Sequence, residues 1–165
     1  MDHLKFIESK IFSIGRQFEQ QLAVWRFHEH RIVFTNGCFD ILHLGHVDYL
    51  ARAAAEGTLM IVGLNTDASV KRIKGDSRPI TDERSRAMAL ASFSFVGAVV
   101  LFGDDTPYEL IKMVQPDILV KGKDYEPGDI VGADIVGQKG GKVITLDLVE
   151  GYSTTAIIER IRNGR

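Results

Sequence analysis

The chain has 165 residues, of which 45% are hydrophobic and 25% are charged. This composition excludes low-complexity disorder and collagen-like repeats, and it suits one domain with a core of its own. The formal net charge of −2 gives no indication of a general affinity for nucleic acids or anionic membranes.

The single cysteine, Cys38, excludes an internal disulfide framework and fits a reducing compartment. The first ten residues lack the positive charges and unbroken apolar stretch of a secretory signal peptide. No window approaches the 18 consecutive apolar residues that a membrane-spanning helix requires. We therefore expect a cytoplasmic protein that binds neither membranes nor nucleic acids.

Residues 3–28 show helical periodicity. Apolar side chains recur three or four residues apart at Leu4, Ile7, Ile11, Ile14, Phe18, Leu22 and Trp25. This spacing predicts a helix with one apolar stripe, although Gly15 leaves a kink or two shorter helices open. The stripe packs either on the core of its own chain or, because it is long for a small domain, on a second subunit. We assign residues 1–30 to an N-terminal helical extension and expect a homodimer.

From Arg31 onward, short apolar runs alternate with amphipathic segments. The sequence predicts strands at 31–35, 59–65, 97–102, 117–121 and 142–146, and helices at 45–57, 80–93, 106–115 and 153–164. Continuously apolar strands separated by helices are typical of a parallel sheet that is buried on both faces. Residues 31–165 are therefore expected to form a three-layer, Rossmann-like α/β domain, whose ligands bind beyond the carboxyl ends of the strands.

The segment after the first predicted strand has the features of an anion site. His43 and His46 are three residues apart at the start of a predicted helix, where the backbone amides and the helix dipole favour negative charge. Gly45 allows the backbone to come close to a ligand. A metal site is an alternative, with Asp40 as the nearby third ligand, and two incidental structural histidines are another.

Three further segments follow predicted strands. Lys71, Arg72 and Lys74 form a basic turn, which reads either as a solvated face or as a phosphate contact. Lys121, Gly122 and Asp124 leave the fourth predicted strand, where they form either a ligand contact or an ordinary turn. Gly151, Ser153, Thr154 and Thr155 precede the last helix, where free amides and hydroxyls make a second phosphate cradle. In helix 80–93, the sequence alone is compatible with a plain surface arginine at Arg86.

The segment NGCFDILHLGH, residues 36–46, resembles the signature of the cytidylyltransferase-like nucleotidyltransferases, in which H-x-G-H contacts the nucleotide triphosphate. The resemblance covers residues 31–162. It implies that nucleotide is bound by Cys38, Phe39, His43, His46, Lys74, Arg86, Gly122, Asp124, Gly151, Ser153, Thr154 and Thr155. It also implies that His43, His46, Lys71 and Lys74 carry catalysis, and that Lys71 contacts the phosphate of the second substrate. For Arg86 it implies either a contact with the phosphate end of the nucleotide or a brace for the loop.

Within this family the motifs look most like those of the adenylyltransferases that make ADP-heptose, a precursor of surface glycans. The resemblance then implies ATP and a sugar 1-phosphate as substrates, Mg²⁺ bridged through the nucleotide phosphates, and a separate sugar kinase upstream. One alternative is a cytidylyltransferase acting on glycerol 3-phosphate, but Leu148 stands where those enzymes usually have an arginine. The other alternative is a nucleotide-binding module without turnover.

Overall fold

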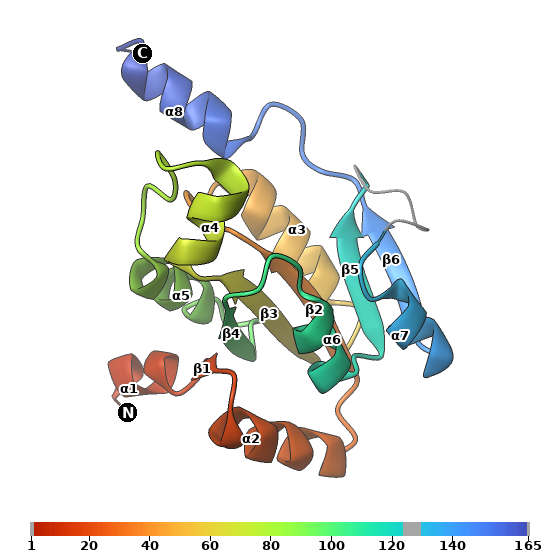
Figure 1. The fold of residues 1–165 in the computed structure, drawn as a ribbon. Coiled ribbons are helices and arrows are strands. Elements are labelled where there is room, and N and C mark those ends of the chain that lie inside the picture. Colours follow the sequence, from red (N-terminus) through yellow and green to blue (C-terminus); the bar gives the residue numbers. More distant parts are fainter. Residues whose placement is uncertain (1, 124–129, 165) are drawn as a thin grey trace.

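The computed structural model describes residues 2–123 and 130–164 (Figure 1). Its strands are β1 (Ile11–Ser13), β2 (Ile32–Gly37), β3 (Leu59–Asn65), β4 (Ala98–Phe102), β5 (Ile118–Gly122) and β6 (Lys142–Leu146). Its helices are α1 (His3–Glu8), α2 (Arg16–Phe27), α3 (Leu44–Ala54), α4 (Asp67–Lys74), α5 (Glu83–Ala91), α6 (Tyr108–Val114), α7 (Ala133–Gln138) and α8 (Thr154–Arg162). Asp124 lies outside the described residues.

Within the described residues, the strands form one sheet in the order β1-β4-β3-β2-β5-β6, and every neighbouring pair is parallel. The predicted α/β fold with a central parallel sheet is thus confirmed, and each of the five predicted strands is present. Strand β1 and helix α7 were not predicted, and the basic turn at 71–74 belongs to a longer helix, α4, than the sequence indicated.

Alternating side chains of the strands divide the core into two layers. In β2, Ile32 and Phe34 pack into one cluster with apolar residues of α2, α6 and α7. Val33, between them, packs into the other cluster with residues of α1, α3 and α5. Because each face of the sheet is covered by helices, the strands are buried on both sides, as a continuously apolar strand requires.

The connections place a crevice at the carboxyl ends of the central strands. From β2 the chain moves outward through β3 to β4, and it then returns to the other side of β2 to form β5 and β6. At such a reversal the helices on either side diverge and leave room beyond the strand ends. Figure 1 shows α8 projecting past this end of the sheet, above α4 and α3.

The prediction of one helical element over residues 3–28 is wrong. The segment forms helix α1, strand β1 and helix α2, and β1 joins the sheet edge beside β4. Two local features explain the break. Gly15 precedes α2 with φ of 155°, a backbone conformation that favours glycine. Lys10 follows α1 and donates its ammonium group to the carbonyls of Ala91 and Phe93, at the end of α5.

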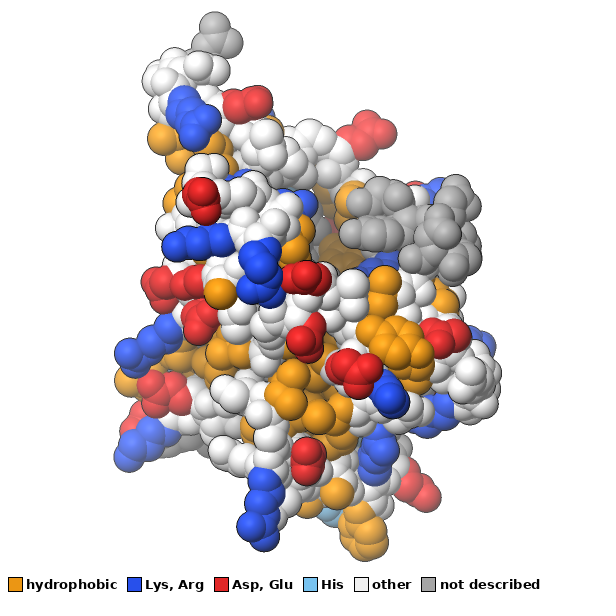
Figure 2. Space-filling view, in the orientation of Figure 1, with side chains coloured by type: hydrophobic (Ala, Val, Ile, Leu, Met, Phe, Trp, Pro, Cys, Tyr) orange, Lys and Arg blue, Asp and Glu red, His pale blue; other side chains and the backbone are white. Residues whose placement is uncertain are grey.

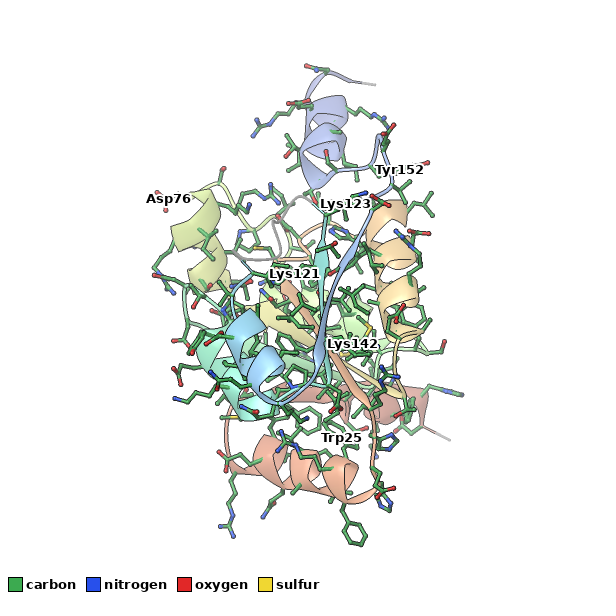
Figure 3. All side chains as sticks on the ribbon, turned by 90° about the vertical axis from the view of Figure 1, so that its right-hand side faces the viewer. Trp25, Asp76, Lys121, Lys123, Lys142 and Tyr152 are labelled. Atoms are coloured by element: carbon green, nitrogen blue, oxygen red, sulfur yellow. The ribbon has the colours of Figure 1, made fainter. Side chains whose placement is uncertain are left out.

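The apolar stripe of this segment is largely covered by its own chain. Phe18 and Leu22 are buried, and Trp25 packs against the same cluster. Trp25, on α2, lies at the end of the sheet opposite Lys121 (Figure 3). Phe12, Phe18 and Trp25 form an aromatic group with ring centroids 5.6–6.5 Å apart. Part of the stripe therefore packs on its own core, whereas Leu4 and Ile14 are 57% and 41% exposed, and the homodimer stays a prediction.

None of the helices in the described part of the chain is long and apolar enough to cross a membrane.

We expect Phe18→Ala to lower the free energy of unfolding by about 3–5 kcal/mol, because it leaves a cavity in a fully buried aromatic cluster. Phe27, on the same helix, is 84% exposed, so Phe27→Ala should change stability by less than about 0.5 kcal/mol. Urea denaturation of both variants measures the difference. Equal losses would contradict the packing of α2 on the sheet.

Candidate active site

A cleft of about 670 Å³ lies at the carboxyl ends of the central strands. Figure 2 shows the surface hollowed below α8 and beside α4. The residues predicted from the sequence that line it are Cys38, Phe39, His43, His46, Lys74, Gly122, Ser153, Thr154 and Thr155. Lys71, Arg86 and Gly151 do not line this cleft, and Asp124 is outside the described residues. The structure thus brings together groups from four separate segments.

His43 and His46 stack on each other at the start of α3. Their ring centroids are 3.8 Å apart with an angle of 24° between the planes, and Phe39 contacts His46 edge-on. His43 is the N-cap residue, so both rings lie where the helix dipole is positive. Gly45 makes the arrangement possible, because a Cβ there would lie 3.1 Å from the His43 ring.

The Nδ1 atoms of both histidines are buried without a hydrogen-bond partner among the described residues. A buried polar atom without a partner is costly, so such atoms in a cleft point to a ligand that satisfies them. Burial, and then the neighbouring His43, lower the pKa of His46 from 6.5 to about 4, while the Ile41 carbonyl offsets part of this effect. Burial also lowers the pKa of His43. The pair is therefore neutral at pH 7 until an anion approaches.

Asp40 fixes the loop that carries the histidines. Its buried carboxylate accepts hydrogen bonds from the backbone amides of Ile80 and Thr81 at 2.8–2.9 Å, and it pairs with Arg78 at 2.5 Å. Burial by itself raises the pKa of Asp40, but the bonds from Thr81, Ile80 and Arg78 outweigh it and bring the pKa below its usual value. The ionised Asp40 thus connects two loops, and its carboxylate oxygens already accept hydrogen bonds from residues 78–81.

Arg86 lies beneath the same loop and is 2% exposed. Its guanidinium donates to the carbonyls of Cys38 and Thr81 at 2.6 and 3.0 Å and pairs with Asp67 at 2.8 Å. This network holds the backbone of Cys38 in place from below the cleft. Burial raises the pKa of the Cys38 thiol, so Cys38 contributes its backbone and volume rather than a thiolate.

The three cationic side chains of the basic turn, at 71, 72 and 74, lie in different surroundings. Lys74 lines the cleft, as does Arg78 from the next loop. Arg72 turns away, since it pairs with Asp105 at 2.9 Å and donates to the carbonyl of Gly103. Lys71 is exposed one helical turn before Lys74. Arg72 therefore lies outside the cleft lining, unlike Lys74.

At the end of β5, Lys121 is buried and donates to the side-chain oxygen of Asn36 on β2. Figure 3 shows Lys121 at the end of the sheet that faces α8. Across the cleft, Ser153 caps α8 by accepting a hydrogen bond from the amide of Ala156 at 3.0 Å. Thr154 donates to the carbonyl of Ile41 at 3.5 Å, so the start of α8 lies beside the loop that carries His43.

The described residues contain no group of three or more His, Cys, Asp or Glu side chains that could hold a metal ion. Asp40, the third ligand of the metal alternative, is engaged by the loop at 78–81.

Comparison with known proteins shows the family to which the chain belongs. The Cytidylyltransferase-like family model matches residues 34–160. The chain belongs to the cytidylyltransferase-like family. The match begins within β2 and leaves α1, β1 and α2 outside it.

Relatives with the name "Bifunctional protein HldE" are similar to most of the chain. The protein from Rhodopseudomonas palustris (strain BisB18) is 50% identical over 96% of this chain and 32% of its own length. The protein from a Nitratiruptor species is 61% identical over 81% of this chain and 28% of its own length. The chain therefore spans about a third of the length of these curated relatives.

A crystal structure of the lipopolysaccharide core biosynthesis protein from Thermoplasma volcanium GSS1 has a similar fold. It matches with a TM-score of 0.58 and 28% identity, over 75% of this chain and 99% of that one.

Sequence reasoning missed several cleft residues of this cytidylyltransferase-like protein. Asn36, Asn65 and Arg78 line the cleft, and so do Leu148 and Tyr152 on the segment that enters α8. The position of Asn36 and Asn65 at the ends of predicted strands was a signal that could have found them. Arg78 carried no such signal, because its place depends on the contact with Asp40.

The pKa of His46 predicts how stability depends on pH. The unfolded chain binds a proton at this position below pH 6.5, whereas the folded chain does so only near pH 4. The free energy of unfolding should therefore fall as the pH drops from 6.5 to about 4. We expect the difference in this free energy between pH 7 and pH 5 to be smaller in His46→Gln, by up to about 2 kcal/mol. Urea denaturation at the two pH values measures it, and parallel behaviour of both proteins would contradict the lowered pKa.

Proposed function

We propose that this protein transfers AMP from ATP to a sugar 1-phosphate, of which heptose 1-phosphate is the best candidate, giving ADP-heptose and pyrophosphate. The observation that carries this proposal is the stacked pair of neutral histidines with unpartnered, buried nitrogens at the start of α3. Membership of the cytidylyltransferase-like family and the likeness to HldE proteins support it. The resemblance of the sequence motifs to ADP-heptose-forming enzymes supports the choice of ATP and heptose.

In this reaction an oxygen of the sugar phosphate attacks the α-phosphorus of ATP. The bond from the α-phosphorus to the oxygen bridging it to the β-phosphorus breaks, and pyrophosphate leaves with the electron pair. The attacking phosphate is already ionised at pH 7, so no general base is required. Catalysis then depends on positioning and on stabilising the charge that develops in the transition state.

The residues of the cleft fit these tasks. His43 and His46 hydrogen-bond the α-phosphate and the leaving pyrophosphate, and the added negative charge favours their protonation. Lys74 reduces the repulsion between the two anionic substrates, and Lys71 is proposed for the acceptor phosphate. The free amides and hydroxyls of Ser153, Thr154 and Thr155 bind phosphate oxygens from the opposite side.

Mg²⁺ is proposed to enter with ATP. Since the described residues hold no cluster of ligands and Asp40 is engaged in the loop, phosphate oxygens and water would supply most of its coordination. When bound, it would neutralise charge on the triphosphate.

We further propose that a sugar kinase acting upstream supplies the sugar 1-phosphate, which agrees with the word "bifunctional" in the names of the longer relatives. A cytoplasmic location is proposed because it suits the single, unpaired Cys38. A homodimer remains a proposal from the family resemblance.

A pyrophosphate-release assay of the four nucleoside triphosphates against sugar 1-phosphates and alcohol phosphates tests the proposed function. We expect turnover with ATP and heptose 1-phosphate. His46→Ala should lower turnover by about 10²-fold or more without unfolding the protein, because it removes a group that stabilises charge in the transition state. Turnover with CTP and glycerol 3-phosphate would favour the cytidylyltransferase alternative. ATP binding without pyrophosphate release would favour the non-catalytic module.

The basic turn provides a second test. Lys74→Ala and Lys71→Ala should each lower kcat/KM for the sugar 1-phosphate. The corresponding loss of transition-state stabilisation should be about 1.5–3 kcal/mol, the range of charge-assisted contacts. Arg72→Ala is the matched control and should cost clearly less, because its guanidinium is engaged by Asp105 and Gly103. Equal and mild effects of all three changes would indicate a solvated basic face.

A further inference from the structure

Two asparagines stand at the ends of the adjacent central strands and have no role in the phosphate chemistry described above. Asn36 is on β2, and Asn65 is the last residue of β3. The register pairs Asn36 with Gly63, so Asn65 lies two residues further along the neighbouring strand. Both side chains line the cleft. The glycine between them is needed, because a Cβ at Gly63 would lie 3.1 Å from the Cβ of Asn36.

The hydrogen bonds fix which end of the Asn65 amide faces the cleft. The hydroxyl of Ser69 donates its one proton to the carbonyl of Asp104 at 3.3 Å. It must therefore accept from Asn65, whose Nδ2 lies 2.8 Å away. No described residue donates to the Oδ1 of Asn65, although the residue is 4% exposed. Asn65 thus offers a fixed acceptor to a ligand.

Asn36 is oriented in the opposite sense. The ammonium group of Lys121 has only donors, so it must bond the Oδ1 of Asn36. The Nδ2 of Asn36 remains, and no described residue accepts from it. The two strands therefore present an amide donor and a carbonyl acceptor, both uncharged and both held in one orientation.

The two ends of the cleft differ in character. On the β3 and β4 side the lining includes Asp105 and Thr106, together with Ile73, Lys74 and Pro107, and Arg72 holds the Asp105 carboxylate. A carboxylate repels phosphate but accepts hydrogen bonds from hydroxyl groups. On the β5 and β6 side the lining residues are the apolar Val131, Leu148 and Val149, together with Tyr152. Flat apolar surface suits a nucleobase and gives a sugar ring few hydrogen bonds.

We infer that Asn36 on β2 and Asn65 on β3 form the recognition site for the hydroxyl groups of the acceptor sugar, with Asp105 and Thr106 on the Asn65 side. This inference rests on the proposed function, because it assigns one of its two substrates to one end of the site. Each hydroxyl group both donates and accepts, so adjacent hydroxyls on a ring match one carbonyl and one amide. A site built in this way rejects acceptors that lack the hydroxyl, because its own polar groups are then left unpaired.

The first test measures the KM of each substrate separately. Asn65→Ala and Asn36→Ala should raise the KM for heptose 1-phosphate by about tenfold or more and change the KM for Mg-ATP by less than about twofold. Asn163→Ala, at the end of α8 and outside the cleft, is the control and should change neither. An unchanged KM for the sugar phosphate, or an equal rise for both substrates, would overturn the inference.

The second test asks whether the lost contact is made to a hydroxyl group. A set of sugar 1-phosphates, each lacking one ring hydroxyl, is compared in the wild type and in Asn65→Ala. For one of these deoxy sugars, kcat/KM should be lower than for the parent sugar by about tenfold or more in the wild type. In Asn65→Ala the same comparison should give a fall of less than about threefold. If removing that hydroxyl lowers kcat/KM by the same factor in both proteins, Asn65 does not contact it. A merely structural role of Asn65 would lower kcat/KM for the sugar and its deoxy analogue alike.

A binding measurement separates this inference from the proposed function. The side-chain amide signals of Asn36 and Asn65 are assigned in ¹⁵N NMR spectra by their loss in the variants. Titration with mannose 1-phosphate should shift both signals, whether or not nucleotide is transferred. Absence of turnover with every sugar 1-phosphate would defeat the proposed function alone. Shifts of the histidine signals without shifts of these two amides would defeat the inference alone.

Discussion

The ionised carboxylate of Asp40, buried beneath a cleft suited to anions, is the constraint on which the site depends. It ties the loop after β2 to the loop before α5 through the amides of Ile80 and Thr81 and the guanidinium of Arg78. Arg86 reinforces the same connection from below through the carbonyls of Cys38 and Thr81. A charge this deeply buried is tolerated because several donors replace its water shell. These donors also remove the freedom of the backbone that carries the histidines.

The loop held by Asp40 and Arg86 carries two neutral histidines into the cleft. His43 and His46 remain uncharged at pH 7 because burial and mutual repulsion lower the pKa of His46 to about 4 and burial lowers that of His43. Their stacking would be unfavourable if both were charged. A nearby anion raises the pKa of an imidazole, so under the proposed function a bound phosphate would favour the charged form of the pair. Lys74, the last residue of α4, brings an ammonium group to the cleft.

The N-terminal segment stabilises the sheet rather than the site. Strand β1 covers the edge of β4, and the amide of Val99 donates to the carbonyl of Lys10 at 2.9 Å. Helix α2 covers the lower part of one face through Phe18 and Leu22. An exposed parallel edge would carry unpaired backbone groups, so this addition protects the sheet at the side away from β6. The family model begins after this segment, at residue 34.

The sequence by itself determined the order of strands and helices after residue 31, because buried parallel strands leave unbroken apolar runs. It also pointed to the segments that meet at the cleft, since ligands of such sheets bind where the strands end. Periodicity misjudged residues 3–28, because a three-residue edge strand is stabilised by hydrogen bonds to β4 that no local pattern records. Only the tertiary structure decided that Arg86 supports the loop at Cys38 and that Asp40 connects two loops. It also decided which ends of the Asn36 and Asn65 amides face the cleft. These roles depend on partners distant in the sequence, and side-chain orientation is settled by those partners rather than by residue type.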